Sequence, residues 1–124
     1  MIQQEKIVVL GASQNPSRTS YMATRYLHNR GFSLFAIANR KGMIENIELH
    51  DDSELATALK ADTITVFLQP ERQKKYYEYI LSLKPRRIIF NPGTENPELV
   101  QLAGQHNIEV LTGCTIAMLA GGLL

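Results

Sequence analysis

Hydrophobic runs separated by polar turns recur along this chain and predict strands that alternate with helices. The first run, residues 6–10, has no alternation of apolar and polar positions, which is typical of a parallel strand covered on both faces. Strand-like runs occur at residues 6–10, 34–38, 63–68, 86–90 and 108–111. Helices are predicted at residues 19–30, 53–59, 70–83 and 97–105, with a short one after Cys114.

Capping and turn residues support these boundaries. Gly31 suits the left-handed position after a helix, and Pro70 suits a first helical turn. Asp52 or Ser53 would cap the second helix, and residues 44–49 read as a short edge segment. The spacing indicates parallel βαβ units. We therefore expect an α/β fold in one domain spanning residues 1–124. It would be a doubly wound, mainly parallel, five-stranded Rossmann-like sheet with helices on both faces.

Composition and charge narrow the class of partner. With 124 residues, 44% hydrophobic and 20% charged, the chain has ordinary globular values and is not of the disordered class. Thirteen basic against twelve acidic residues give a net charge of +1, too balanced for a broad nucleic-acid-binding face. A local basic pocket stays compatible with that balance, so we expect a small molecule rather than nucleic acid as the partner.

Neither a membrane partner nor export is expected. The most apolar stretch, residues 116–124, is interrupted by Gly121 and Gly122 and is shorter than the roughly 20 residues that cross a bilayer. The amino-terminal residues lead directly into the first strand-like run without the pattern of a signal peptide. Cys114 is the sole cysteine, which excludes an intramolecular disulfide and fits a reducing compartment. A cytoplasmic location is the expectation.

The turn after the first strand is the first candidate binding element, because ligands of open parallel sheets bind beyond the carboxyl ends of the strands. A dinucleotide fingerprint would need glycines at positions 13 and 16, where the chain has Ser13 and Pro16. The start of the following helix still offers free N–H groups, and Arg18 adds a phosphate donor. Two interpretations stay open: a phosphate site, or a plain helix cap formed by Ser17 or Thr19 beside a solvated Arg18.

The turn after the second strand separates ligand classes. NAD-binding proteins usually place a carboxylate there for the ribose hydroxyls, whereas this chain has Asn39, Arg40 and Lys41. Cations would attract a ribose phosphate that a carboxylate would repel. The turn therefore favours coenzyme A (CoA) or NADP over NAD, the alternative being a solvated basic loop.

The later turns carry weaker signals. Gln69 and Pro70 follow the third strand, and residues 91–96 follow the fourth, where Gly93 would allow close backbone approach and Asn91 could offer amide hydrogen bonds. The ordinary preference of turns for these residue types explains their presence as well as a ligand-binding role does. Cys114 follows the fifth strand near a predicted helix start, where a thiol is either a reactive group or a buried small hydrophobe.

Other chemistries lack their sequence patterns. The three histidines have no metal-ligand spacing, and neither a P-loop nor a nucleophile elbow occurs. Arg72 and the other basic residues of the 70–87 region read as solvated charges. The 70–83 helix has more apolar surface than one face needs, which leaves Tyr77 and Leu81 as candidates for a homodimer contact.

With these turns located, the chain resembles the CoA-binding domain family, which has a Rossmann-type fold like the amino-terminal domain of the succinyl-CoA synthetase alpha subunit. The resemblance runs from about residue 6 to residue 116. It rests on VLGAS at 9–13, NPS at 15–17, NRKG at 39–42, VFL at 66–68 and NPGTEN at 91–96, with Cys114 downstream. Arg40 is a departure, since the family more often has proline after the asparagine. The ligase's phosphohistidine loop has no counterpart here, so ligase activity is not implied.

The resemblance implies CoA lying over the strand ends. Gly11, Ser13, Ser17 and Arg18 would then hold phosphates, residues 39–41 the ribose phosphate, and residues 67–70 the adenine or pantetheine. The turns and the resemblance together nominate these cofactor-binding residues: Gly11, Ala12, Ser13, Ser17, Arg18, Thr19, Asn39, Arg40, Lys41, Phe67, Leu68, Gln69, Pro70, Asn91 and Gly93.

Three functions fit these observations. The first is a CoA or acyl-CoA binding protein without a complete catalytic set, because no paired nucleophile and base is evident. The second is an NADP-dependent oxidoreductase, for which 124 residues leave little room for a substrate domain. The third is a dimeric regulatory protein with a vestigial nucleotide cleft, in which Cys114 could form a mixed disulfide with a thiol such as CoA.

Overall fold

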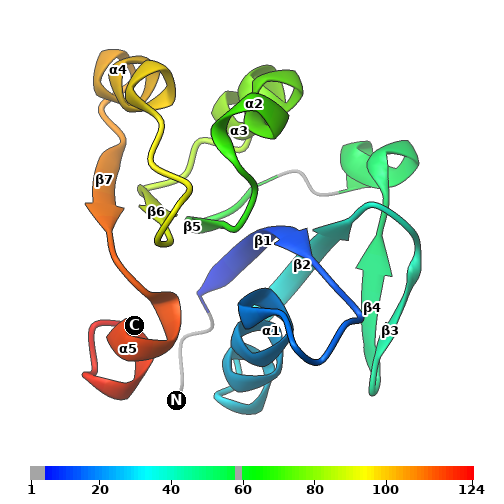
Figure 1. Cartoon of the computed structure of the whole chain (residues 1–124). Coiled ribbons are helices and arrows are strands. Elements are labelled where there is room, and N and C mark those ends of the chain that lie inside the picture. The colour runs from blue at the N-terminus through cyan, green and yellow to red at the C-terminus, as the bar shows by residue number, and fades with distance from the viewer. Residues whose placement is uncertain (1–4, 58–59) are drawn as a thin grey trace.

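The residues described by the computed structural model, 5–57 and 60–124, form one seven-stranded sheet with helices on both faces (Figure 1). The order across the sheet is β3-β4-β2-β1-β5-β6-β7. Only the β3–β4 pair is antiparallel among these strands. The strands are β1 (Lys6–Ala12), β2 (Ser33–Ala38), β3 (Gly42–Ile44), β4 (Ile47–His50), β5 (Thr63–Val66), β6 (Arg87–Phe90) and β7 (Glu109–Thr112).

The central strand β1 explains the unbroken apolar run. It pairs in parallel with β2 on one side and β5 on the other, with Val9 opposite both Ala36 and Thr65. Val8 and Leu10 pack into the core on one face, and Ile7 and Val9 pack into the core on the other. Because both faces are covered, each of the positions 7–10 is apolar and buried, and the prediction of a doubly covered strand is confirmed.

Helices cover both faces of the sheet, as predicted (Figure 1). The face that carries α1 and α5 buries Leu27 and Leu119, and the face that carries α2, α3 and α4 buries Ile80 and Leu99. The helical segments are α1 (Thr19–Asn29), the 3₁₀ turn η1 (Asp52–Thr57), α2 (Pro70–Gln73), the 3₁₀ turn η2 (Lys74–Tyr76), α3 (Tyr77–Ser82), α4 (Pro97–Gln105) and α5 (Thr115–Ala120).

The predicted number of five strands is wrong, because the segment read as one edge element is a hairpin of two strands. β3 and β4 pair through Ile44 and Ile47, so that Glu45 and Asn46 alone form the turn. Glu45 takes a φ of 54°, which is uncommon for a residue other than glycine. A two-residue hairpin turn usually carries glycine, so this one gave no sequence signal.

The predicted helix at 70–83 is also interrupted, since η2 separates α2 from α3. The buried side chains Gln73 and Tyr76 are three residues apart, whereas Tyr76 and Ile80 are four apart. A 3₁₀ turn repeats every three residues, so tightening the chain here brings all three side chains to the sheet. The short helix predicted at 53–59 is present in its described part as the 3₁₀ helix η1, and residues 58 and 59 lie outside the described residues.

In the described parts of the chain, every helix is too short or too polar to cross a membrane.

The hairpin generates a prediction about stability. Ile44 is 1% exposed and its neighbour Met43 is 49% exposed, although both lie on β3. Ile44→Ala should lower the free energy of unfolding by about 2–4 kcal/mol because it leaves a cavity, measured by urea denaturation. Met43→Ala should change it by less than about 1 kcal/mol. Equal small effects would mean that the hairpin does not belong to the cooperative core.

Candidate functional site

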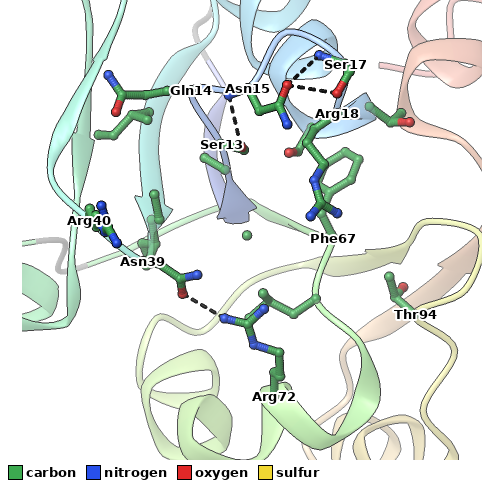
Figure 2. A pocket seen from close by; sticks show the side chains of 18 of the residues that line it. Ser13, Gln14, Asn15, Ser17, Arg18, Asn39, Arg40, Phe67, Arg72 and Thr94 are labelled. Carbon is green, nitrogen blue, oxygen red and sulfur yellow. Dashed lines mark hydrogen bonds between the residues drawn. The ribbon is translucent and has the colours of Figure 1, made fainter.

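A cleft of about 650 Å³ opens over the carboxyl ends of the central strands. The chain passes from β1 to β2 on one side of it and, after β4, continues with β5 on the other side, so the strand order reverses at β1. Such a reversal of strand order is where open α/β sheets bind ligands, because the connections diverge and leave a crevice. Figure 2 shows that side chains from the turns after β1, β2 and β5 converge on this cleft.

The turn after β1 is held by side chains of its own. Gly11 has a φ of +103°, and a Cβ atom there would lie 3.1 Å from the Leu68 side chain. Ser13 Oγ accepts a hydrogen bond from the Asn15 N–H at 3.0 Å. Asn15 Oδ1 accepts from the Ser17 N–H at 3.0 Å and from Ser17 Oγ at 2.8 Å (Figure 2). These bonds fix the path by which the chain enters α1.

The start of α1 lacks the side-chain cap that one interpretation expected. The N-cap residue is Arg18, and neither Ser17 nor Thr19 caps the helix within the described chain. Ser17 Oγ is directed to Asn15 instead. The Tyr21 N–H donates to the Arg18 carbonyl oxygen at 3.1 Å, but no side chain in the described chain caps the N–H groups of Thr19 and Ser20, which keep their hydrogen-bonding capacity. Ser17, Arg18, Thr19 and Ser20 all line the cleft.

The turn after β2 contributes two of its three nominated residues. Asn39 and Arg40 line the cleft. Lys41 does not line it, and its Nζ lies 3.9 Å from a carboxylate oxygen of Glu54. The same glutamate contacts the His50 ring at 3.1 Å, and Glu48 lies 3.9 Å from the other ring nitrogen. The fold thus brings a histidine and two carboxylates together outside the cleft, which spacing alone had not indicated.

Arg72, which the sequence had suggested to be a solvated charge, lines the cleft from α2. Its Nη2 donates a hydrogen bond to Asn39 Oδ1 at 2.8 Å, and Figure 2 shows this bond between α2 and the turn after β2. The two residues are 33 positions apart in the sequence. Arg72 is exposed, as the sequence suggested, and the fold adds the contact with Asn39 at the wall of the cleft.

The cleft is cationic although the whole chain is nearly neutral. Arg18, Arg40 and Arg72 line it, and its described lining contains neither an aspartate nor a glutamate. Within residues 5–57 and 60–124, no carboxylate forms an ion pair with any of the three guanidinium groups. Their positive field is consequently available to an anion that enters the cleft.

The remaining nominated residues divide between the wall of the cleft and its surroundings. Gly11, Ala12, Ser13, Phe67 and Leu68 line the cleft, whereas Gln69, Pro70, Asn91 and Gly93 do not. Sequence reasoning missed further lining residues, namely Gln14, Asn15, Ser20, Ile37, Ala38, Leu49, Arg72, Tyr76, Pro92 and Thr94. Several of these directly adjoin the identified turns in the sequence, and that position could have predicted them as lining residues. Nothing in the sequence indicated that Leu49, Arg72 and Tyr76 line the cleft.

Gln14 connects the turn after β1 to the β3–β4 hairpin by a hydrogen bond. Its Nε2 donates to the Met43 carbonyl oxygen at 3.1 Å. Gly42 makes room for this contact, because a Cβ atom at that position would lie 2.5 Å from the Gln14 side chain. The hairpin thereby holds the turns after β1 and β2 in one arrangement at the mouth of the cleft.

Asn91 lies beneath the cleft and bonds three elements together. It is 3% exposed. Its Nδ2 donates to Thr65 Oγ1 and to the Val66 carbonyl, each at 2.8 Å, and its Oδ1 accepts from the Thr115 N–H at 2.9 Å. Since both amide hydrogens and the oxygen are occupied, Asn91 joins β5, β6 and α5 rather than facing the cleft.

The titratable groups of the cleft do not form a catalytic pair. Besides the arginines, Tyr76 is the titratable side chain of the described lining. Burial, followed by the hydrogen bond to Asp52, raises the pKa of Tyr76. Bonds from Lys75 and Tyr76 lower the pKa of Asp52. The Tyr76 phenol is therefore a neutral hydrogen-bond donor rather than a base. Cys114 is the N-cap of α5 and lies outside the lining.

Fold and site together define a Rossmann-like α/β protein with a cationic cleft over the strand ends. A family model described as "CoA binding domain" matches residues 5–120. The chain therefore belongs to the CoA-binding domain family, and the resemblance seen in the sequence is confirmed.

Solved structures agree with this assignment. A crystal structure of an uncharacterized protein shares 35% identity and superposes with a TM-score of 0.90, covering 99% of this chain and 100% of that one. A protein from Thermus thermophilus, cell-free ID.343, shares 25% identity with a TM-score of 0.75, covering 90% and 84%. No curated protein gives a significant sequence match.

A more distant structural neighbour belongs to a larger enzyme. The NADPH-dependent glyoxylate/hydroxypyruvate reductase of Sinorhizobium meliloti shares 15% identity and a TM-score of 0.64. The match covers 91% of this chain and 57% of the reductase. At this identity the likeness shows the common fold alone.

The buried amide of Asn91 generates a prediction. Asn91→Ala should lower the free energy of unfolding by about 2–4 kcal/mol, because three buried hydrogen-bonding groups, two on β5 and one on α5, lose their partner. Urea denaturation would measure the loss. Asn29→Ala, at an exposed position ending α1, is the matched control and should change stability by less than about 0.5 kcal/mol. A loss for Asn91→Ala as small as the control's would contradict the bracing role.

Proposed function

We propose that this protein binds CoA or an acyl-CoA in the cleft, without a complete catalytic set of its own. The observation that carries the proposal is the charge of the cleft, where Arg18, Arg40 and Arg72 face the ligand space and no described lining residue is acidic. CoA bears a pyrophosphate and a ribose 3′-phosphate, so its anionic groups match this arrangement. Membership of the CoA-binding domain family supports the same ligand.

The two ends of the cleft suit different phosphates. The uncapped first turn of α1, together with Ser17 and Arg18, would hold the pyrophosphate, because helix amino termini offer N–H donors and a partial positive charge. Asn39 and Arg40, at the end of β2, occupy the position that reads the ribose in related folds. The apolar surface of Phe67 and Leu68 would contact the adenine or the pantetheine.

NADP binding is the second candidate, and a specific observation favours it. The turn after β2 carries Asn39 and Arg40 where an NAD-binding protein usually has a carboxylate, so a ribose 2′-phosphate would also be accepted. The NADPH-dependent reductase among the structural neighbours has the same fold. CoA is preferred because of the family and because the cleft offers no acid–base pair for substrate chemistry.

A dimeric regulatory role in the cytoplasm is the third candidate. Tyr77 and Leu81 pack partly against the core, and the Tyr77 hydroxyl donates to Glu98 Oε1 at 2.8 Å. The two residues predicted to form a homodimer contact therefore make part of their contacts inside the chain. Cys114 would serve this role if it formed a mixed disulfide with a thiol ligand.

Calorimetric titration with CoA, 3′-dephospho-CoA, NADP and NAD tests the proposal. We expect CoA to bind most tightly and to exceed dephospho-CoA by at least about tenfold, because charge-assisted contacts to a phosphate contribute about 1.5–3 kcal/mol. Arg40→Ala should reduce that preference severalfold. Lys41→Ala removes the same charge one residue along, outside the cleft, and should leave the preference unchanged.

The result that would overturn the proposal is equal or absent binding of CoA and dephospho-CoA by the wild-type protein. A stronger response to NADP would support the second candidate, and no response to any of the four would support the third.

The pyrophosphate end gives a separate prediction. Arg18→Ala should lower the affinities for CoA and dephospho-CoA by the same factor, about tenfold, because both ligands contain the pyrophosphate. Arg30→Ala, at the opposite end of α1, is the matched control and should leave both affinities unchanged. Calorimetry measures both. A loss confined to CoA would place Arg18 at the ribose phosphate instead.

A further inference from the structure

The contact between Arg72 and Asn39 joins two elements at the wall of the cleft. Arg72 lies on α2, after β5, and Asn39 lies in the turn after β2. Their hydrogen bond, from Nη2 to Oδ1, is 2.8 Å long, and Figure 2 shows it at the side of the cleft where Arg40 also lies. Neither the family assignment nor the turn pattern in the sequence draws attention to Arg72.

The partner of Arg72 is a neutral group. A guanidinium carries five N–H donors and binds carboxylate or phosphate oxygens most strongly, in pairs. Among the described residues, the side-chain hydrogen bond of Arg72 is the single one to the Asn39 amide oxygen, and no ion pair accompanies it. Within the described chain, its charge has no acidic partner and most of its donors have no acceptor.

The helix α2, which carries Arg72, is well anchored by the residue that follows it. Gln73, which follows Arg72, is fully buried and donates to the carbonyl oxygens of Leu68 and Thr94, each at 2.8 Å. Asn96 Nδ2 donates to Gln73 Oε1 at 2.9 Å. The Arg72 side chain itself lies on the exposed surface of α2. It can exchange partners by side-chain rotation while α2 stays in place.

We propose that Arg72 is a specificity-determining residue that binds the phosphate on the ribose of a nucleotide cofactor, exchanging the Asn39 amide oxygen for phosphate oxygens. The inference rests on the proposed nucleotide site. Arg72 and Arg40 approach the phosphate from opposite sides, one from α2 and one from the end of β2. Asn39 is the partner of Arg72 that the phosphate displaces.

The location of the contact distinguishes the ribose phosphate from the pyrophosphate. The pyrophosphate position lies at the first turn of α1, next to Ser17 and Arg18. Arg72 instead contacts the residue directly after β2, where the ribose is read in this class of fold. An exchange of a neutral oxygen for a dianionic phosphate strengthens the hydrogen bonds that the guanidinium makes.

Calorimetry on full-length variants tests this role through the ratio of the dephospho-CoA and CoA dissociation constants. Arg72→Ala should lower the ratio about tenfold, with little change in the affinity for dephospho-CoA. Arg72→Lys should restore part of it, because the charge returns without the planar fork. Lys74→Ala, two residues along and outside this cleft, is the matched control and should keep the wild-type ratio.

Variants of Asn39 separate a resting partner from a ligand-binding group. Asn39→Ala should keep the ratio or raise it, because Arg72 loses its competing partner. Asn39→Asp should lower the affinity for CoA more than for dephospho-CoA, since the new carboxylate pairs with Arg72 and repels the phosphate. A drop in the ratio for Asn39→Ala as large as for Arg72→Ala would overturn the exchange, because Asn39 would then bind the phosphate itself.

The same measurements with NADP and NAD separate this inference from the proposed function. If CoA fails to bind but Arg72→Ala abolishes a preference for NADP over NAD, the proposed ligand is wrong and the role of Arg72 stands. If CoA binds and the Arg72→Ala ratio equals the wild-type ratio, the ligand stands and the role of Arg72 is overturned. If the wild-type protein prefers neither CoA over dephospho-CoA nor NADP over NAD, the proposed ligand and the role of Arg72 are both overturned.

Discussion

The close approach of Gly11 to Leu68 is the contact on which the arrangement of the cleft depends. A Cβ atom on Gly11 would lie 3.1 Å from the Leu68 side chain and 3.2 Å from its backbone nitrogen, and the φ of +103° is itself a glycine conformation. Because no side chain intervenes, the turns after β1 and β5 meet over the sheet. That contact brings Phe67 and Leu68 against the turn that leads into Arg18.

Charge is distributed differently at the two ends of the sheet. At the amino ends of the strands, Arg87 is almost enclosed and its Nη2 lies 2.9 Å from Glu5 Oε2, while Arg86 lies 3.4 Å from the same carboxylate. At the carboxyl ends, the arginines of the cleft have no such partner in the described chain. Cations grouped in this way weaken the folded state by mutual repulsion, and an anion bound over the crevice would offset that repulsion.

Local sequence was informative wherever a residue's role depended on its own neighbours. The run at β1 predicted a doubly covered strand, and the turns beginning at Gly11 and Asn39 were located correctly at the strand ends. Local sequence was uninformative where the role of a residue depended on partners distant in the chain. Arg72 looked like an ordinary exposed cation, because Asn39 lies 33 residues away. Asn91 looked like a turn residue, because the groups that occupy its amide lie 24 to 26 residues away.

The amino-acid sequence alone was enough for the alternation of strands and helices, the Rossmann-like class and the edge of the sheet at which a ligand would bind, because these follow from hydrophobic periodicity and turn chemistry. The three-dimensional fold decided the strand count, the break between α2 and α3, and which polar side chains face the cleft. Those features arise when segments far apart in the chain pack together: Gln73 and Tyr76 turn toward the sheet, Gln14 reaches the β3 backbone, and Arg72 reaches Asn39. Periodicity reports which face of an element is apolar, and it holds no information about which distant side chain that face will meet.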